Sequence, residues 1–253
     1  LAGAAGTTPA DFASVKYCIS GGAPLPAEIK DRFKAATGAR IMEGYGLSEA
    51  SPVVACNPRH KPSKIGSVGL VFPGTDVAIF NPDKPTKPLK IGDTGELWVK
   101  GPQVMEGYWN NPTETAHVLV KGGWLRTGDI GHIDADGYIH ITDRLKDMII
   151  SNGYKVYPRV VEDALYHHPA VLEAIVIGIP HAKRGEAPKA FVKLKEGADV
   201  TGEALIAFVS KHLNPLERPV EVEFRQQLPK TLVGKLSKKE LVAEERAKRA
   251  STK

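Results

Sequence analysis

Apolar and polar residues recur with two different periods along this chain, and the dominant period changes twice. Within residues 1–59, a strand is predicted at KYCIS and a helix at AEIKDRFKAATG, where Ile29, Phe33 and Ala36 have helical spacing. Gly38 follows as the C-cap of that helix. A strand, glycine turn, helix and strand in succession predict the end of an α/β layered domain with a mostly parallel sheet.

The apolar pattern shortens to alternating runs over residues 60–143, at TDVAIF, GELWVKG and GYIHIT, with frequent Pro and Gly between them. The tetrapeptide DADG stands between two such runs and predicts a β-hairpin turn. It resembles a fragment of a calcium loop, but the EF-hand spacing and the terminal Glu are absent. We therefore expect a small antiparallel β-barrel subdomain here.

Helical and strand patterns alternate again over residues 144–253. YPRVVEDALYHHPAV and TGEALIAFVSKHL have helical spacing, and Thr201 can cap the second helix. LEAIVIGIP and APKAFVKLK read as strands, so the segment is expected to fold as a compact α+β domain. Its junction with the preceding part, Asp143–Lys146, is densely charged, which suits either a hinge or a salt-bridged surface linker.

Composition supports a packed protein of mixed α/β and α+β class with more than one domain. Of 253 residues, 42% are hydrophobic and 25% are charged, and the apolar runs are far too short to span a bilayer. The start of the chain has no signal-peptide pattern. The two cysteines, Cys18 and Cys56, form no disulfide framework, which favours a cytoplasmic location.

The net charge of +5 raises the question of an anionic partner. Much of the excess lies in the tail KLSKKELVAEERAKRASTK, where Glu alternates with Lys and Arg as on a solvated helix face. No nucleic-acid-binding signature accompanies it, so no nucleic-acid partner is expected. A polyanionic small molecule, such as a nucleotide or coenzyme A, suits the same charge.

The tail also contains PKTLVGKLSK, in which Lys235 directly follows a glycine, as in phosphate-binding loops. A P-loop needs Gly where Pro229 stands and Ser or Thr where Leu236 stands. Proline donates no N–H and leucine cannot ligate magnesium, so this is not a P-loop. Taken alone, Lys235 is either a phosphate ligand or a solvated residue of a basic tail.

Two glycine-rich stretches, SGGAPLP and EGYGLSEASP, carry candidate binding residues. Gly21 and Gly22 let the backbone approach a flat ligand closely, and Tyr45 can lie against a purine ring. Ser48 offers a hydroxyl for a phosphate oxygen, and Glu49 offers a hard carboxylate for Mg²⁺. The alternative is that the glycines form tight turns and that Tyr45 is a core residue.

Three further stretches have similar ambiguity. Asp129 in WLRTGDIG can accept the two hydroxyls of a ribose as an exposed carboxylate, or form an Asx-turn with its own backbone. Arg144 follows a predicted strand and can add a ribose or phosphate contact. The segment around Gly153 offers either a backbone edge for a pantetheine chain or a simple turn.

Together and in this order, the stretches resemble the acyl-CoA synthetases of the adenylate-forming superfamily. YGLSEASP is similar to that family's Tyr-Gly-x-Thr-Glu motif, with Ser48 in place of the commoner Thr. GELWVKGPQVMEGYW, WLRTGDIG, DRLKDMIISNGYKVYP and PKTLVGK are similar to its later motifs. SGGAPLP and SNGYKVYP look most like bacterial fatty-acyl-CoA ligases.

The resemblance implies an acid–thiol ligase that joins a carboxylate, here a medium- or long-chain fatty acid, to CoA. ATP and Mg²⁺ give an acyl-adenylate and pyrophosphate, and the CoA thiol then displaces AMP. It assigns Glu49 to Mg²⁺ and the hinge to Asp143 and Lys146. It assigns ATP and AMP binding to Gly21, Gly22, Ala23, Glu43, Gly44, Tyr45, Gly46, Leu47, Ser48, Asp129, Ile141, Arg144 and Lys235, and CoA binding to Asn152, Gly153 and Tyr154.

The same resemblance gives Lys235 a catalytic role, with Ser48 and Glu49 beside it. A lysine charge that bridges the α-phosphate and the attacking carboxylate stabilises the transition state more than the ground state. In the family, the C-terminal domain swings about the hinge between the half-reactions. Lysines in this motif resemble sites of inactivating acetylation, so a lysine acetyltransferase is an expected partner, and a lipid substrate suggests peripheral membrane association.

The family's phosphate loop is not found in this sequence, so the chain is expected to be the C-terminal half of a longer ligase. We expect its N-terminal half to be a partner and the 253 residues alone to be inactive in adenylation. Two alternatives stay open: a non-catalytic adenylate- or CoA-binding module, and an adenylating enzyme that loads a carrier protein. Luciferase chemistry is a weaker third reading of the same motifs.

Overall fold

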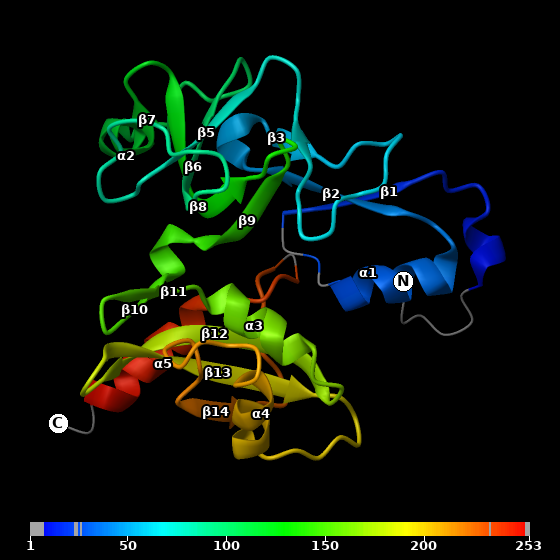
Figure 1. Cartoon of the computed structure of the whole chain (residues 1–253), viewed down its shortest axis with the longest axis vertical. Coiled ribbons are helices and arrows are strands. Elements are labelled where there is room, and N and C mark those ends of the chain that lie inside the picture. The colour runs from blue at the N-terminus through cyan, green and yellow to red at the C-terminus, as the bar shows by residue number, and fades with distance from the viewer. Residues whose placement is uncertain (1–7, 23–24, 26, 233, 251–253) are drawn as a thin grey trace. The chain divides into compact units, whose positions relative to one another are not determined.

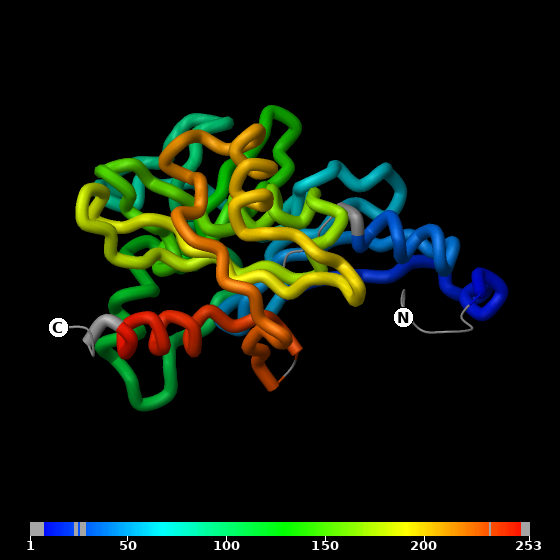
Figure 2. Tube along the Cα trace, turned by 90° about the horizontal axis from the view of Figure 1, so that it is seen from below, coloured from blue at the N-terminus to red at the C-terminus, as the bar shows by residue number. Residues whose placement is uncertain are grey.

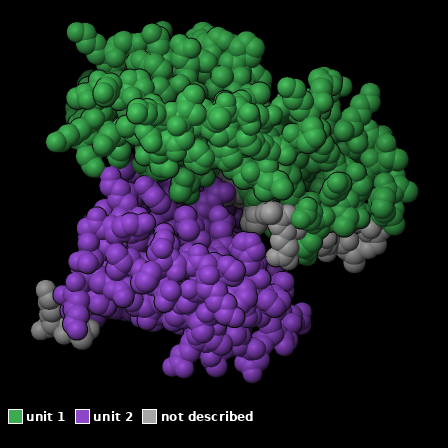
Figure 3. Space-filling view, viewed as in Figure 1, with its two compact units in different colours: residues 1–142 green, residues 143–253 purple. Residues whose placement is uncertain are grey.

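The computed structural model describes residues 8–22, 25, 27–232 and 234–250. The chain divides into two compact units, residues 1–142 and residues 143–253, which Figure 3 colours separately. Among the residues that it describes, no helix is long and apolar enough to cross a membrane. The fold is mixed α/β with several sheets, as expected from the sequence.

The first sheet of unit 1 follows a 3-10 turn, Pro9–Phe12. Helix α1, Ala27–Thr37, leads from β1 to β2 and is confirmed, with Gly38 at φ +68° and its N–H on the Lys34 carbonyl. Only β1 and β2 are parallel, so the expected mostly parallel sheet is wrong for the described strands. The strand order is β1 (Cys18–Gly21), β2 (Ile41–Gly46), β3 (Val53–Cys56), β4 (Leu70–Val71).

The second sheet of unit 1 forms the expected antiparallel β subdomain (Figure 1). Its order is β5–β6–β8–β7, with β9 also paired to β8. The DADG hairpin is confirmed, because the Asp134 carboxylate accepts the N–H groups of Asp136 and Tyr138 and closes the turn. The elements are β5 (Asp76–Phe80), β6 (Gly95–Lys100), α2 (Pro112–Val118), β7 (Leu119–Val120), β8 (Trp124–Ile133) and β9 (Ile139–Arg144).

Unit 2 is the compact α+β part of the chain. Its sheet has the order β11–β10–β13–β12, and β14 pairs in parallel with β13. Thr201 caps α4 by accepting the N–H of Ala204, as predicted. The elements are β10 (Ile149–Ser151), β11 (Tyr154–Val156), α3 (Pro158–Tyr166), β12 (Val171–His181), β13 (Gly185–Leu194), α4 (Gly202–Val209), β14 (Glu221–Phe224) and α5 (Lys239–Ala250).

The apolar run of β12 is explained by burial on both faces of the sheet. Ala174 and Val176 belong to the core cluster with α3 and α4, whereas Ile175 and Ile177 belong to the cluster with Leu241 of α5. Successive side chains of a strand point to opposite faces, so both sets are apolar. Figure 2 shows α5 in red, directly after the orange segment that precedes it in sequence.

The expectation of a solvated tail helix is therefore wrong for one face of α5. Leu241 is fully buried and Glu245 is 7% exposed, whereas Lys239 and Lys248 remain exposed. The alternation of charges in the sequence hid this face, because one of its buried residues is itself charged. Its partner, Lys189 of β13, is 56 residues away in sequence.

Candidate functional site

The carboxyl ends of β1 and β2 form one corner of the candidate site. The strands are parallel, with Ser20 opposite Glu43 and Gly21 opposite Gly44. Gly22 then turns the chain at φ +76°. Ligands of open α/β sheets bind beyond the carboxyl ends of the strands, which is where these glycines lie. Ala23, the third predicted residue of this turn, lies outside the described residues.

Tyr45 and Asp129 meet although 84 residues separate them in sequence. The Tyr45 hydroxyl donates to Asp129 Oδ2 at 2.6 Å, which links β2 to β8. Asp129 is only 6% exposed, so the expectation of an exposed carboxylate is wrong. Because the Tyr45 hydroxyl binds Oδ2, a ribose would have to share the Asp129 carboxylate with Tyr45.

Glu43–Gly46 forms the carboxyl end of β2, and Leu47 follows it. Several of these residues have structural reasons for their identity. Glu43 pairs with Lys30 of α1 at 3.1 Å, and Leu47 packs against the core cluster of unit 1. A Cβ on Gly46 would collide with the backbone carbonyl of Pro52, so only glycine fits there. This stretch is therefore held between β1 and β3, the two strands with which β2 pairs.

Ser48 and Glu49 lie on a single 3-10 turn, Ser48–Ala50, directly after Leu47. Ser48 is exposed and Glu49 is half-buried. Glu49 Oε1 accepts the hydroxyl of Tyr108 at 2.8 Å, and its backbone carbonyl accepts the N–H of Met105 at 2.8 Å. Partial burial and the hydrogen bond to Glu49 raise the pKa of Tyr108 to about 12.

Tyr108 was not identified from the sequence. Its N–H donates to Thr115 Oγ1 at 2.9 Å, and Thr115 belongs to helix α2. Asn111 caps that helix by accepting the N–H of Glu114. The Asn-Pro start and the acidic first turn could have predicted α2. The contact with Glu49, 59 residues away, has no sequence signal.

The Glu49 carboxylate suits Mg²⁺ as one ligand among several. Mg²⁺ is commonly held by one or two carboxylates together with substrate phosphates, and keeps several waters. The Tyr108 hydroxyl engages Oε1 and orients the carboxylate, as an outer-shell partner does. Among the described residues, no group of three or more His, Cys, Asp or Glu could hold a metal by itself. Glu49 is thus suited to a metal that arrives with a phosphate.

The predicted ribose and hinge residues lie along β9 and after it. Ile141 packs partly against the unit 1 core, and Arg144 is exposed at the strand end. Asp143 is 7% exposed and accepts the N–H of Arg159, in the first turn of α3, at 2.8 Å. Lys146 is exposed on a short 3-10 turn. Asp143 is therefore anchored, whereas Lys146 lies on the surface.

The predicted CoA segment is a two-residue hairpin turn at the edge of the unit 2 sheet. Asn152 (φ +52°) and Gly153 (φ +77°) connect β10 to the edge strand β11, as both central residues of a type I′ turn require. Tyr154 is 47% exposed. The Asn152 N–H donates to the backbone carbonyl of Arg184, which brings the segment that contains Arg184 beside the turn. The segment is therefore a turn, and the strand that follows it is also an exposed edge of the sheet.

Lys235 lies at the exposed tip of a small hairpin. Thr231 and Lys235 are joined twice, by the Thr231 N–H to the Lys235 carbonyl at 2.7 Å and by the Lys235 N–H to Thr231 Oγ1 at 3.2 Å. Gly234 has φ +78°, which favours glycine. Leu232 is fully exposed beside them. The tip is thus a closed turn that presents Lys235 outward.

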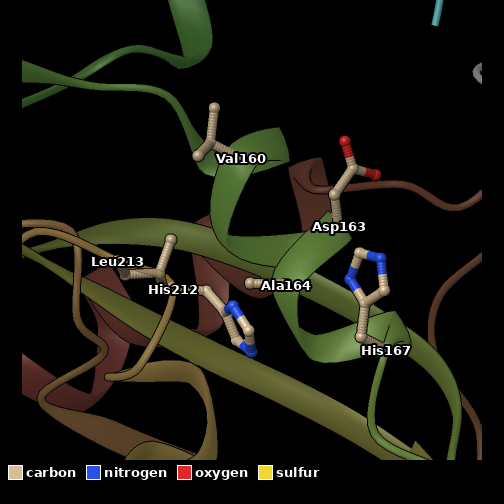
Figure 4. Close-up of a pocket in the computed structure, with 6 residues that line it drawn as sticks. All are labelled: Val160, Asp163, Ala164, His167, His212 and Leu213. Carbon is tan, nitrogen blue, oxygen red and sulfur yellow. The ribbon is translucent and has the colours of Figure 1, made fainter.

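A separate hollow of about 280 Å³ lies on the surface of unit 2 (Figure 4). Burial raises the pKa of Asp163 on its rim. None of the predicted site residues borders it, so it is not the candidate nucleotide site. It is lined by Val160, Asp163, Ala164, His167, His212 and Leu213.

Known proteins resemble this chain along nearly its whole length. It is 50% identical to the long-chain-fatty-acid–CoA ligase of Bacillus subtilis over 93% of the chain, which is 42% of the relative's length. ATP-bound MatB from Rhodopseudomonas palustris superposes with a TM-score of 0.90 at 34% identity, over 95% of this chain and 48% of that one. The anthranilate CoA ligase AuaEII, in complex with anthranoyl-AMP, superposes with a TM-score of 0.84 at 30% identity, over 94% of this chain and 46% of that one.

The chain therefore spans less than half the length of the relatives that it matches. Two family models divide it between them. The model for AMP-binding enzymes matches residues 2–109, and the model for the AMP-binding enzyme C-terminal domain matches residues 160–235. Together with the relatives, they show that this chain belongs to the AMP-binding, or adenylate-forming, enzyme superfamily.

Proposed function

We propose that the full-length protein containing this chain is an ATP-dependent fatty-acid–CoA ligase. It converts a medium- or long-chain fatty acid, ATP and CoA into acyl-CoA, AMP and pyrophosphate through an acyl-adenylate. The observation that carries the proposal is the 2.6 Å hydrogen bond by which Tyr45 meets Asp129 beside the glycine ends of β1 and β2. The 50% identity to a long-chain-fatty-acid–CoA ligase supports the substrate class.

The roles of the residues in unit 1 follow from their chemistry. The glycine ends of β1 and β2 admit the adenine, and Tyr45 lies against it while its hydroxyl orients Asp129 for the ribose. Ser48 contacts the α-phosphate. Glu49, oriented by Tyr108, would hold Mg²⁺, which when bound neutralises charge on the phosphate oxygens. Ile141 adds a ribose contact, and so does Arg144, which belongs to unit 2.

Unit 2 supplies the residues that distinguish the two half-reactions. Lys235 stabilises the negative charge that develops while the carboxylate attacks the α-phosphorus. The Asn152–Gly153 turn and the exposed edge at Tyr154 receive the pantetheine chain of CoA. We propose that rotation about Asp143–Lys146 exchanges these two functions between adenylation and thioester formation.

A carboxylate panel tests this function directly. The full-length protein, supplied with ATP, Mg²⁺ and CoA, is expected to form AMP fastest with medium- or long-chain fatty acids and to need CoA for turnover. AMP formation without any carboxylate preference, or with aryl acids alone, would contradict the fatty-acid assignment. Calorimetry with AMP and CoA separates a non-catalytic binding module, which would bind both without forming acyl-CoA.

Tyr108→Phe is expected to weaken the use of Mg²⁺ without unfolding the protein. The change removes only the hydroxyl that orients Glu49, and loss of such a partner typically costs about 10–100-fold in metal affinity. The measurement is the Mg²⁺ concentration that gives half-maximal pyrophosphate release by the full-length protein. Trp109→Phe is the matched control, because Trp109 is the next residue and is 91% exposed. An unchanged Mg²⁺ requirement in Tyr108→Phe would exclude the orienting role.

Two further proposals concern the cellular setting. The free thiols of Cys18 and Cys56 support a reducing, cytoplasmic location, and a lipid substrate favours contact with the inner membrane surface. Lys235 is an exposed residue, which suits modification by an acetyltransferase, and acetylation would remove the charge that adenylation needs. Mass spectrometry of protein from its native host tests for the acetyl group.

A further inference from the structure

The hairpin that carries Lys235 has a paired stem as well as a closed tip. Lys230 and Leu236 form an antiparallel bridge, and the Ser237 N–H donates to the Pro229 carbonyl at 2.9 Å. Leu236 packs against an apolar cluster of unit 2. The stem is therefore attached to the body of unit 2 through Leu236 on its second strand and through Leu228, which directly precedes its first strand. That cluster consists of Ile175, Ile177, Ile179, Phe191, Leu228 and Leu241.

Two lysines tie the ends of this stem to the body by ion pairs, but in different surroundings. Lys230 Nζ lies 2.6 Å from Glu173 Oε1, with 43% of the lysine side chain exposed. Lys238 Nζ lies 3.2 Å from Glu162 Oε1, with the two side chains 23% and 16% exposed. Exposed pairs contribute little to stability, whereas shielded pairs are screened less by solvent and salt. The pair at Lys238 is therefore the stronger constraint.

The acceptors of Lys238 are themselves fixed by backbone groups. Glu162 Oε1 also accepts the N–H of Val176 in β12 at 2.8 Å. The second carboxylate near Lys238 is that of Asp143, whose Oδ1 lies 4.0 Å from Nζ. Asp143 Oδ2 accepts the N–H of Arg159 in α3. Because β12 and α3 hold these carboxylates in place, the ammonium between them has little freedom to move.

We propose that Lys238 is a positioning residue for Lys235, and that Glu162 and Asp143 act with it. Lys238 lies three positions after Lys235, at the end of the strand that leads back from the tip to the body. We call Lys238, Glu162 and Asp143 the clamp. The clamp fixes the direction in which this strand leaves the body of unit 2, and hence the position of the Lys235 ammonium. This inference rests on the proposed role of Lys235 in adenylation.

A purely structural role for Lys238 makes a different prediction. Lys238 directly precedes α5, and its carbonyl accepts the N–H of Val242 in the first turn of that helix. If the side chain served only to stabilise α5, its loss would lower the unfolding free energy of unit 2 and affect both half-reactions equally. A positioning residue instead affects the step that uses Lys235 and leaves the other step unchanged.

Lys238→Met keeps the aliphatic stem and removes the charge, Lys238→Arg restores a charge, and Lys230→Met is the matched control on the opposite strand of the stem. Adenylation by the full-length protein is expected to fall roughly 10–100-fold in kcat for Lys238→Met, since a displacement of about 1 Å can cost about 100-fold. The KM for ATP should change little, and thioester formation from supplied acyl-adenylate should stay at the wild-type rate. Lys238→Arg should recover most of the loss, and Lys230→Met should stay within about threefold of wild type.

Hydrogen exchange in the 253-residue chain judges the clamp independently of catalysis. The N–H groups of Gly234 and Ser237, which close the tip and stem, should exchange at least several-fold faster in Lys238→Met than in Lys230→Met. Unchanged exchange in Lys238→Met would overturn the inference. Faster exchange with an unchanged rate of adenylation would also overturn it, while leaving the proposed ligase function intact.

Glu162→Gln tests the same ion pair from its other side, in case the Lys238→Met protein fails to fold. The amide oxygen can still accept the Val176 N–H, but the charge opposite Lys238 is lost. A folded Glu162→Gln protein with wild-type adenylation would overturn the inference, and a selective loss of adenylation would support it. If the wild-type protein forms no acyl-adenylate at all, the proposed function fails, and the positioning of Lys235 for adenylation fails with it, whatever the exchange rates.

Discussion

Lys235→Ala in the full-length protein is expected to lower the rate of acyl-adenylate formation by about 10²–10³, the usual cost of losing one transition-state contact. Lys235 is an exposed residue, and the hydrogen bonds that close its turn use its backbone N–H and carbonyl, so Lys235→Ala keeps them. Thioester formation from supplied acyl-adenylate should stay close to the wild-type rate. The reason is that charge on the α-phosphorus develops in the first step through attack by the carboxylate.

The two half-reactions have to be measured separately. Pyrophosphate release without CoA reports adenylation, and CoA consumption with synthetic acyl-adenylate reports the second step. Lys239→Ala is the matched control, because Lys239 is an exposed lysine at the start of α5. Equal losses in both steps would mean that Lys235 holds the nucleotide throughout, and a loss in Lys239→Ala would point to general electrostatic attraction.

Local chemistry explains which parts of the fold could be predicted. The Thr201 cap, the Gly38 C-cap and the turn at Asp134 each depend on hydrogen bonds within about four residues. Such signals are visible in the sequence without knowledge of the rest of the chain. The position of α2 was missed although Asn111 and Pro112 carried a similar signal, because the segment was interpreted as part of the β subdomain.

Contacts between distant segments explain what could not be predicted. Tyr108 reaches Glu49 across 59 residues, and Tyr45 reaches Asp129 across 84. The family resemblance indicates Glu49, Tyr45 and Asp129 as candidate site residues, but no sequence pattern indicates that two tyrosine hydroxyls engage the two carboxylates. The same holds for the buried face of α5, since a charged residue on a helix is ordinarily solvated.

That buried face gives the largest expected effect on stability. Lys189 of β13 is 3% exposed, and its Nζ lies 2.6 Å from Glu221, 2.8 Å from Glu223 and 3.0 Å from Glu245. Burial alone would lower the pKa of Lys189, but the hydrogen bonds that its ammonium donates to these carboxylates raise the pKa well above its ordinary value. The lysine therefore stays charged and joins β13, β14 and α5.

Lys189→Met is expected to destabilise unit 2 by about 3–5 kcal/mol, because removing one partner of a buried ion pair leaves the other charges uncompensated. Lys248→Met is the matched control. Lys248 contacts Glu223 and Glu245 too, but it is 51% exposed, so its loss should cost no more than about 1 kcal/mol. Similar losses in both variants would show that total charge, and not the buried position, governs stability.

Urea unfolding of the 253-residue chain at neutral pH measures this difference. All three tryptophans, Trp98, Trp109 and Trp124, belong to unit 1, so their fluorescence serves as an internal control that should not change. Circular dichroism reports both units, and exchange of the α5 amides reports unit 2 alone. A shift in tryptophan fluorescence equal to the shift in α5 exchange would mean that the units unfold together.

Acid provides a second test of the same network. Burial alone would raise the pKa of Glu223, but hydrogen bonds from Lys189, Lys248 and Arg225 lower it to about 2, against an ordinary value of 4.5. A depressed carboxylate pKa stabilises the folded state fully above pH 4.5, and this stabilisation is lost as the pH falls toward about 2. In Lys189→Met the carboxylates lack their main cation, so protonation relieves their repulsion. The stability gap between wild type and Lys189→Met should therefore narrow between pH 4.5 and about 2, and a gap that stays constant would show that the lost stability came from packing and not from charge.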